Sequence, residues 1–326
     1  MRTDDLSSSP LGVRGKILVC PLNWGLGHAT RCVPIIRKLV ADGHEVVIVA
    51  DGYPLAFLQQ QFLSLRFIEF PSYEVYYAAG KSQVGAMIFN FPNIIKGIIY
   101  EHIWLRNLLN KEHFDQVISD NRFGMWNKRV HSIYMTHQLM IKMPVNLKFM
   151  EPLVHRIHKA IINRYTECWI PDRAENDGLS GDLAHKYPLP RNASFIGTLS
   201  RFKELKDIQP NEEHDVVVVI SGPEPQRTIF EDYLLTRFRN RPEKTLIVRG
   251  QPQIENYHRR YVGNITLVPH LSDAELAAAL LGARKIICRS GYSSIMDLDA
   301  LNCLQKAELI PTPGQTEQEY LSLIYS

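Results

Sequence analysis

The sequence predicts an α/β protein made of two doubly wound domains in tandem, with a cleft between them. One observation is that short apolar strands alternate with helical segments along the chain. The other is that two strands turn through glycine into a helix, at Gly25–His28 and at Ser290–Ser294. Such a turn leaves unpaired backbone N–H groups where the helix dipole favours an anion. Two such turns facing one cleft suggest an enzyme that holds a phosphorylated donor and moves a group from it.

The first half of the chain opens with a complete βαβ unit, which predicts a parallel sheet. Residues 16–20 form an apolar strand, residues 28–42 have helical spacing that ends at Gly43, and residues 45–50 form a second strand. We expect a long helical segment over 83–109, interrupted at Pro92. The further strands are expected at 65–70, 114–119, 132–136, 168–171 and 194–196. The carboxyl ends of these strands are where a doubly wound domain binds its ligand.

A second cycle begins after a charged stretch at 202–214. The β-branched run at 215–220 is typical of a central parallel strand, and Ser221 and Gly222 form its exit turn. The expected elements that follow are a helix at 228–238, strands at 245–248 and 265–268, a helix at 273–281 capped by Ser272, and a strand at 285–288. The predicted organisation is therefore a disordered leader at 1–14, an N-terminal domain at 15–200 and a C-terminal domain at 201–326.

Composition excludes several classes of protein. With 45% hydrophobic and 22% charged residues and a net charge of +3, the chain is typical of a soluble globular protein and carries too little positive charge to predict nucleic-acid binding. Five scattered cysteines predict reduced core thiols in a cytoplasmic protein. The polar N-terminus is unlike a signal peptide, and no run reaches the roughly 18–20 apolar residues of a membrane span.

Four motifs together resemble the glycosyltransferases of the GT-B fold. They are Gly25-Leu26-Gly27-His28, Ser221-Gly222-Pro223, Arg289-Ser290-Gly291-Tyr292-Ser293-Ser294 with Asp297, and Pro311 to Glu319. The resemblance is closest to the MurG type, which transfers N-acetylglucosamine from its UDP conjugate to a lipid-linked acceptor. It implies two Rossmann-like domains and a UDP-linked sugar as donor substrate, with no other cofactor. Because the chain stops at Ser326, soon after the last motif, we expect a short C-terminal domain.

On the donor side, the resemblance assigns phosphate contacts to the turn at Ser290 and Gly291. The hydroxyls of Ser293 and Ser294 would supplement the backbone N–H groups there. The other donor contacts that it implies are Arg201 and Arg289 for phosphate, Asp297 for the ribose hydroxyls, Gln318 and Glu319 for the sugar, and Ser221 and Gly222 for a second turn facing the phosphates. A surface role for either arginine and an ordinary polar loop for the last motif remain open.

On the acceptor side, His28 matches the family histidine proposed as general base. An imidazole titrates near neutral pH and can accept the proton of an acceptor hydroxyl, as an inverting displacement requires. The alternative is that His28 only caps its helix. Gly25 and Gly27 would shape the acceptor loop, and Asp120 and His137, at the ends of neighbouring strands, are rival bases or structural hydrogen-bonding groups.

Three further expectations concern metals, membranes and function. We expect transfer without a metal, because fixed hydrogen-bond donors can neutralise the departing diphosphate. Apolar and basic residues at 84–100 and 138–164 suggest peripheral contact with the inner face of a membrane, although a core-packing helix explains them equally well. The acceptor would be a glycan or a lipid-linked molecule. The alternatives are a UDP-sugar epimerase and a non-catalytic or truncated nucleotide-sugar-binding subunit.

Overall fold

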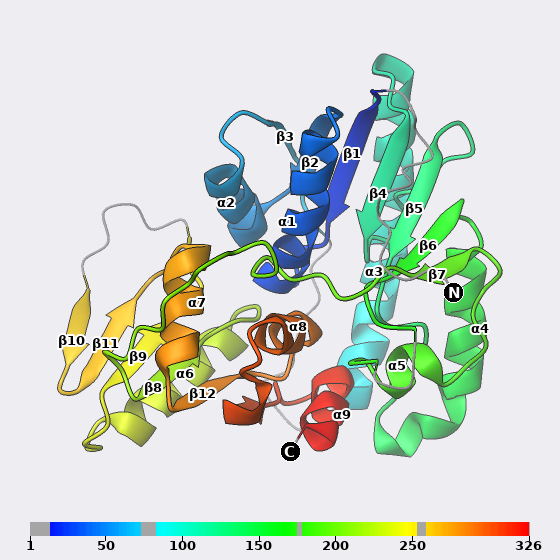
Figure 1. Ribbon diagram of the computed structural model, residues 1–326. Helices are drawn as coiled ribbons and strands as arrows, with labels where there is room; N and C mark the ends of the chain where they lie inside the picture. The colour runs from blue at the N-terminus through cyan, green and yellow to red at the C-terminus, as the bar shows by residue number, and fades with distance from the viewer. Residues whose placement is uncertain (1–13, 73–82, 175–177, 253–258, 326) are drawn as a thin grey trace. The chain divides into compact units, whose positions relative to one another are not determined.

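The computed structural model describes residues 14–72, 83–174, 178–252 and 259–325 (Figure 1). They fall into two compact units. Unit 1 contains the chain up to Asn23 and then Cys32–Leu199, and unit 2 contains Trp24–Arg31 and the chain from Ser200 onward. The predicted ranges put residues 24–31 in the N-terminal domain, whereas this segment packs on residues of unit 2. Of the predicted leader, only Arg14 lies within the described residues.

Unit 1 is built on a seven-stranded parallel sheet in the order β3-β2-β1-β4-β5-β6-β7. The chain starts in the middle of this sheet and winds outward in both directions, as a doubly wound domain does. The strands are β1 (Lys16–Pro21), β2 (Glu45–Ala50), β3 (Arg66–Glu69), β4 (Gln116–Asp120), β5 (His131–Met135), β6 (Glu167–Ile170) and β7 (Ala193–Phe195). The buried Val and Ile residues of β1, β2 and β4 explain why this strand trio forms the centre.

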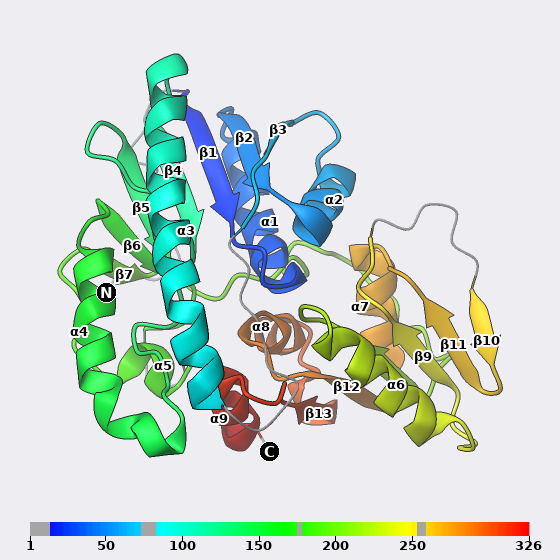
Figure 2. The ribbon, with the colours of Figure 1, turned by 180° about the vertical axis from the view of Figure 1, so that it is seen from behind.

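Helices cover both faces of this sheet. They are α1 (Leu26–Ala41), α2 (Gly52–Gln61), α3 (Gln83–Lys111), the 3-10 helix η1 (Val145–Met150), α4 (Glu151–Ile162) and α5 (Asp182–His185). Helices α3 and α4 lie in the foreground of Figure 2, on one face of the sheet. The expected interruption at Pro92 is wrong, because α3 runs through this proline as one 29-residue helix.

Unit 2 is built on a six-stranded sheet in the order β10-β11-β9-β8-β12-β13, in which only β10 runs antiparallel to its neighbour. The strands are β8 (Val216–Val219), β9 (Thr245–Val248), β10 (Arg260–Val262), β11 (Ile265–Val268), β12 (Lys285–Arg289) and β13 (Ala307–Ile310). The helices are α6 (Gln226–Phe238), α7 (Asp273–Gly282), α8 (Tyr292–Ala300), the 3-10 helix η2 (Leu304–Lys306) and α9 (Thr316–Ile324). The predicted α/β class with doubly wound parallel sheets is confirmed.

Two local predictions are also confirmed. Ser272 begins α7 with a capping box, in which its hydroxyl accepts from the Glu275 N–H and the Glu275 carboxylate accepts from the Ser272 N–H. All five cysteines are buried and free. Among the helices of the described residues, none combines the length and the hydropathy needed to cross a bilayer.

Candidate functional site

The turn between β12 and α8, in unit 2, carries the predicted phosphate-binding residues. Gly291 is the N-cap of α8, and no side chain caps this helix. A Cβ at Gly291 would meet nothing closer than the Gln318 amide nitrogen, 4.0 Å away. The Ser294 side chain makes no hydrogen bond within the described residues and is half-buried. The first N–H groups of α8 therefore border open space, where a helix N-terminus attracts an anion.

The segment Trp24–Arg31 packs directly on this turn and on the turn after β8. The Ser293 hydroxyl donates to the Gly27 carbonyl oxygen at 2.8 Å. A Cβ at Gly27 would lie 3.0 Å from that hydroxyl, and a Cβ at Gly25 would lie 3.3 Å from the Gly222 Cα. Gly25 and Gly222 also have φ values of 100° and 103°, which favour glycine. These glycines allow the two turns to approach each other within unit 2.

His28 stands on the first turn of α1, in this segment, and its ring is engaged by Arg31. The Arg31 Nη2 lies 3.0 Å from the His28 Nδ1. A guanidinium can only donate, so Nδ1 accepts, and a neutral ring then carries its proton on Nε2. In this arrangement neither ring nitrogen is ready to take a proton from an acceptor. A role as general base therefore requires the Arg31 contact to open.

Asp297 lies on α8 and binds residues of the linker. Its Oδ1 accepts from the Ser200 hydroxyl at 2.6 Å, and its Oδ2 lies 3.5 Å from the Arg201 Nε. Arg201 also donates to the Asp273 carboxylate at 2.9 Å. Burial raises the pKa of Asp297 to about 6, and Arg201 opposes this rise. The structure thus places both predicted donor contacts in an internal ion-pair network.

One residue, Leu298, separates Asp297 from Asp299, which is the spacing of an Asp-x-Asp metal motif. The expectation of metal-independent transfer did not take this pair into account. In the described residues no group of three or more metal-ligating side chains comes together. Asp297 is already bound by Ser200 and Arg201.

The Arg289 side chain makes internal contacts in unit 2. Its Nη1 donates to the Pro311 carbonyl at 2.8 Å, and its Nη2 donates to the Gln226 carbonyl at 3.3 Å. The guanidinium carbon lies 3.8 Å from the centre of the Phe230 ring, and the side chain is buried. Burial lowers the pKa of Arg289 to about 10. The group ties together the ends of β12 and β13 and the start of α6, away from solvent.

Ser290, Gln318 and Glu319 also make internal contacts. The fully buried Ser290 donates to the Gln318 carbonyl at 2.8 Å. The Gln318 Oε1 accepts from the Thr312 N–H at 2.8 Å, and the Glu319 Oε1 accepts from the Gly314 N–H at 3.2 Å. These bonds hold the loop before α9 in place. Gln318 and Glu319 lie in the first turns of α9, and not in an ordinary polar loop, which was the alternative to sugar contacts.

Asp120 and His137 belong to unit 1, at the ends of neighbouring strands as predicted. Asp120 ends β4 and is fully buried, and the Cys32 thiol donates to its Oδ2 at 3.7 Å. His137 follows β5 and is 4% exposed. Such burial suits structural hydrogen bonding. Their roles toward an acceptor remain predictions.

The structure adds residues that the sequence did not single out. Ser200, Asp273 and Arg31 each contact a predicted site residue. His270 follows β11, and burial lowers its pKa to about 4, with the nearby Arg201 acting in the same direction. Since ligands bind at the carboxyl ends of parallel strands, the position of His270 was a signal that could have identified it. The partners of Ser200 and Asp273 were hidden by their separation along the chain, whereas Arg31 lies three residues from His28, one helical turn away, and this spacing was a local signal.

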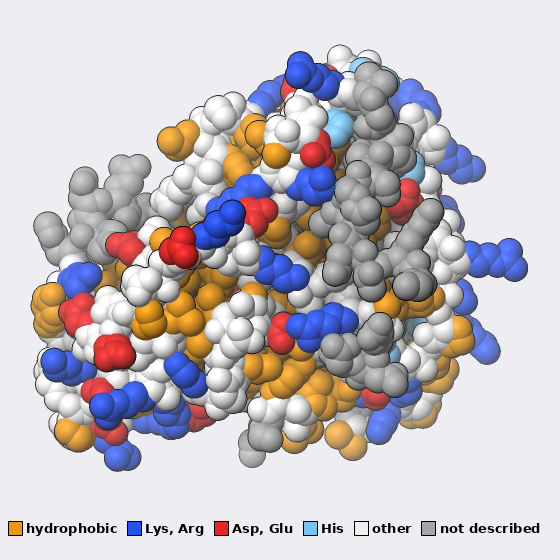
Figure 3. Space-filling view, in the orientation of Figure 1, with side chains coloured by type: hydrophobic (Ala, Val, Ile, Leu, Met, Phe, Trp, Pro, Cys, Tyr) orange, Lys and Arg blue, Asp and Glu red, His pale blue; other side chains and the backbone are white. Residues whose placement is uncertain are grey.

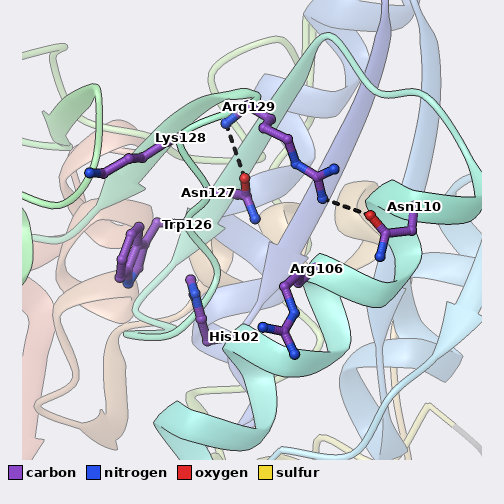
Figure 4. Close-up of a pocket in the computed structure, with 7 residues that line it drawn as sticks. All are labelled: His102, Arg106, Asn110, Trp126, Asn127, Lys128 and Arg129. Carbon is purple, nitrogen blue, oxygen red and sulfur yellow. Dashed lines mark hydrogen bonds between the residues drawn. The ribbon is translucent and has the colours of Figure 1, made fainter.

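A separate pocket of about 490 Å³ lies in unit 1, and none of the predicted site residues line it (Figure 4). Its lining comes from the second half of α3 and from the loop before β5. Arg129 donates to the Asn110 side chain at 2.9 Å, and its N–H donates to the Asn127 side chain at 3.0 Å. These bonds close one side of the pocket, which is rich in cationic side chains.

Comparisons with known proteins concern the whole chain. No protein-family model and no curated protein sequence matches it. Among solved structures, the glycotransferase of kitacinnamycin has a TM-score of 0.57 at 14% identity, over 95% of this chain and 84% of that chain. Arabidopsis thaliana UGT89C1 with quercetin has a TM-score of 0.57 at 11% identity, over 95% and 82%. A putative UDP-N-acetylglucosamine 2-epimerase from Listeria monocytogenes has a TM-score of 0.53 at 11% identity, over 96% and 88%. The chain therefore has the fold of the GT-B glycosyltransferases, with two Rossmann-like parts.

Proposed function

We propose that this chain is an inverting glycosyltransferase. It moves a hexosyl or hexosaminyl group from a nucleotide diphosphate sugar, most simply a UDP sugar, to an acceptor hydroxyl. The observation that carries the proposal is the uncapped N-terminus of α8 at Gly291, which opens beside the Trp24–Arg31 segment within unit 2. A structural neighbour, Arabidopsis thaliana UGT89C1, is described in complex with UDP-L-rhamnose, and this supports a nucleotide-sugar donor.

In this proposal the donor diphosphate binds the N–H groups at the start of α8, and the Ser294 hydroxyl adds a further hydrogen bond. These fixed donors neutralise the charge that develops on the diphosphate as the glycosidic bond breaks. The acceptor hydroxyl attacks the anomeric carbon from the opposite side, and its proton passes to His28. For that step Arg31 must leave the His28 Nδ1, so that the ring proton can move there and Nε2 can accept.

Four of the other predicted donor contacts have a positioning role in this proposal. Arg201 and Asp297 fix the linker at Ser200 against α8, and Ser290 and Gln318 hold the loop before α9. They act by positioning the start of α8. A MurG-type substrate pair, N-acetylglucosamine with a lipid-linked acceptor, is one form of the proposal. A small-molecule acceptor is another, because the same neighbour is described with quercetin.

The first experiment measures donor binding by calorimetry with UDP, GDP and dTDP sugars. Gly291→Val should lower donor affinity by at least about tenfold, because the new side chain fills the space beside the α8 N–H groups. Gly291 has φ −73°, so valine is compatible with this backbone and the melting temperature should change little. Ser64→Val, at an exposed position of unit 1, is the matched control. Equal affinity in Gly291→Val and the wild type would exclude this site.

The second experiment measures turnover. His28→Ala should abolish sugar transfer and leave donor affinity unchanged, whereas His113→Ala, at an exposed position, should alter neither. Unchanged turnover in His28→Ala would reject the general-base role. The epimerase alternative is favoured by the neighbour from Listeria monocytogenes, and it predicts UDP-sugar interconversion with no acceptor present. A non-catalytic subunit would bind the donor and never consume it.

A further inference from the structure

Helix α4 of unit 1 points three of its polar side chains, Glu151, His155 and His158, inward. His155 donates from Nδ1 to the Leu139 carbonyl at 3.0 Å, and the His158 Nε2 lies 3.2 Å from the Tyr134 hydroxyl. The carboxylate of Glu151 accepts from the Lys186 ammonium at 2.9 Å. These three side chains are buried. These bonds fix the rotation of α4 about its own axis.

The outward face of the same segment is apolar. Val145, Phe149, Leu153 and Ile157 are spaced four residues apart along η1 and α4, and their exposed fractions are 89%, 79%, 53% and 54%. A helix of a soluble protein normally turns such a stripe toward the core. Here the stripe cannot turn inward without breaking the bonds of His155, His158 and Glu151. We call these four residues the outer stripe.

Within residues 145–164 of the described chain, cations accompany the outer stripe and no acidic side chain is exposed. Lys148, Arg156 and Arg164 are exposed, and Lys159 is half-buried. The one acidic residue between positions 145 and 164 is the buried Glu151, whose charge Lys186 already neutralises. Figure 3 shows hydrophobic and basic side chains along the lower right edge of the molecule, over η1 and α4. The segment therefore offers apolar area and unbalanced positive charge on one face.

We propose that η1 and α4 dock on the surface of an anionic lipid bilayer. Phe149, Leu153 and Ile157 enter the boundary between head groups and acyl chains, and Lys148 and Arg156 lie among the lipid phosphates. A second copy of this chain fits the surface less well, because a two-fold contact would bring the same cations face to face with no carboxylate between them. The buried histidines present the helix already folded, so docking requires no coil-to-helix transition.

The proposal goes beyond sugar transfer and does not depend on it. Lipid binding can be measured in the absence of donor and acceptor. A negative result with vesicles would say nothing about donor binding. A negative result in the donor-binding experiment would say nothing about lipid binding.

The experiment is co-sedimentation of the full chain with two kinds of vesicle. One kind contains phosphatidylcholine alone, and the other contains phosphatidylcholine with about 30% phosphatidylglycerol, which gives the vesicle a negative surface potential. The wild type should bind the anionic vesicles and bind the neutral ones much more weakly. Phe149→Asp with Ile157→Asp should lower binding by at least about tenfold. Leu63→Asp, at a position of unit 1 that is 91% exposed and outside the outer stripe, is the matched control and should bind like the wild type.

Charge is tested separately with Lys148→Gln and Arg156→Gln. Each change should weaken vesicle binding roughly fivefold at low salt. At about 0.5 M salt the effect should be smaller, because the salt screens exposed charges. Circular dichroism and melting should be unchanged for all variants, since every substituted side chain is exposed. The proposal is overturned if the wild type does not bind anionic vesicles, or if the Phe149→Asp, Ile157→Asp variant binds as well as Leu63→Asp does. It is also overturned if sedimentation shows a dimer that the double variant dissociates, because the stripe then contacts a second copy.

Discussion

At the residue scale, Arg289 shows how one side chain can fit a family motif and still have a structural role. Its guanidinium makes two carbonyl contacts and packs on the Phe230 ring in a buried setting. We predict that Arg289→Met destabilises the protein by about 2–4 kcal/mol, since buried carbonyl partners are left without a donor. Donor affinity of the folded protein should stay within about twofold of the wild type.

Chemical denaturation measures the first quantity and calorimetry the second. Arg284→Met, at an exposed position that follows α7, is the control and should alter stability by less than about 0.5 kcal/mol. A large loss of donor affinity in Arg289→Met with stability retained would show instead that Arg289 contacts phosphate.

At the element scale, the start of α7 depends on a single hydroxyl. Ser272 accepts from the Glu275 N–H at 3.3 Å and completes a capping box. We expect Ser272→Ala to lower the free energy of unfolding of unit 2 by about 1 kcal/mol, and Ser272→Asp to restore most of it, because aspartate also caps. Denaturant titration of the three proteins checks this. If Ser272→Asp is as unstable as Ser272→Ala, the cap is not the cause.

The cap of α7 could be predicted from the sequence because Ser272 and Glu275 are three residues apart. Strand β8 could be predicted because it is a run of valines. The orientation of α4 could not be predicted from the sequence, because the spacing of its apolar residues is the same whether Leu153 and Ile157 face the core or the solvent. The inward contacts of His155 and His158 decide it, and their partners Leu139 and Tyr134 lie outside the helix.

The same reason limits what the sequence predicted of the candidate site. The turn at Ser290 and Gly291 is local, so its strand-glycine-helix pattern was visible. Asp297 lies 97 residues from its partner Ser200, and Arg201 lies 72 residues from its partner Asp273. Their ion-pair network was therefore not visible in the sequence. The sequence predicted Arg201 as a phosphate contact and Asp297 as a ribose contact, and only the fold shows that the two side chains bind each other.

At the scale of the whole molecule, each unit contains a carboxyl group with a raised pKa. Burial raises the pKa of Glu101, in unit 1, to about 6, although Arg122 opposes the rise. Burial likewise raises the pKa of Asp297, in unit 2, to about 6. A raised carboxyl pKa means that the folded state binds more protons than the unfolded chain at pH values between the two pKa values. The stabilisation is therefore present near pH 4 and is lost as the pH rises through 6.

We predict that each of these carboxyls lowers the free energy of unfolding by about 2–3 kcal/mol between pH 4 and pH 7. His158 and His270 act in the opposite direction over this range, because burial lowers the pKa of each to about 4 and the unfolded chain then binds more protons than the folded protein. Glu308 acts in the opposite direction at lower pH, because hydrogen bonds from Arg237 and Lys285 lower its pKa to about 2 and its stabilisation is lost as the pH falls toward that value. The carboxyl and histidine contributions between pH 4 and pH 7 therefore oppose each other. Denaturant titrations of the wild type and of Glu101→Gln at pH 4 and pH 7 test the contribution of Glu101. Compared with the wild type, Glu101→Gln should raise the free energy of unfolding at pH 7 relative to pH 4 by about 2 kcal/mol. The same pH 4 to pH 7 difference in Glu101→Gln and in the wild type would show that Glu101 is ionised in the folded protein throughout this range.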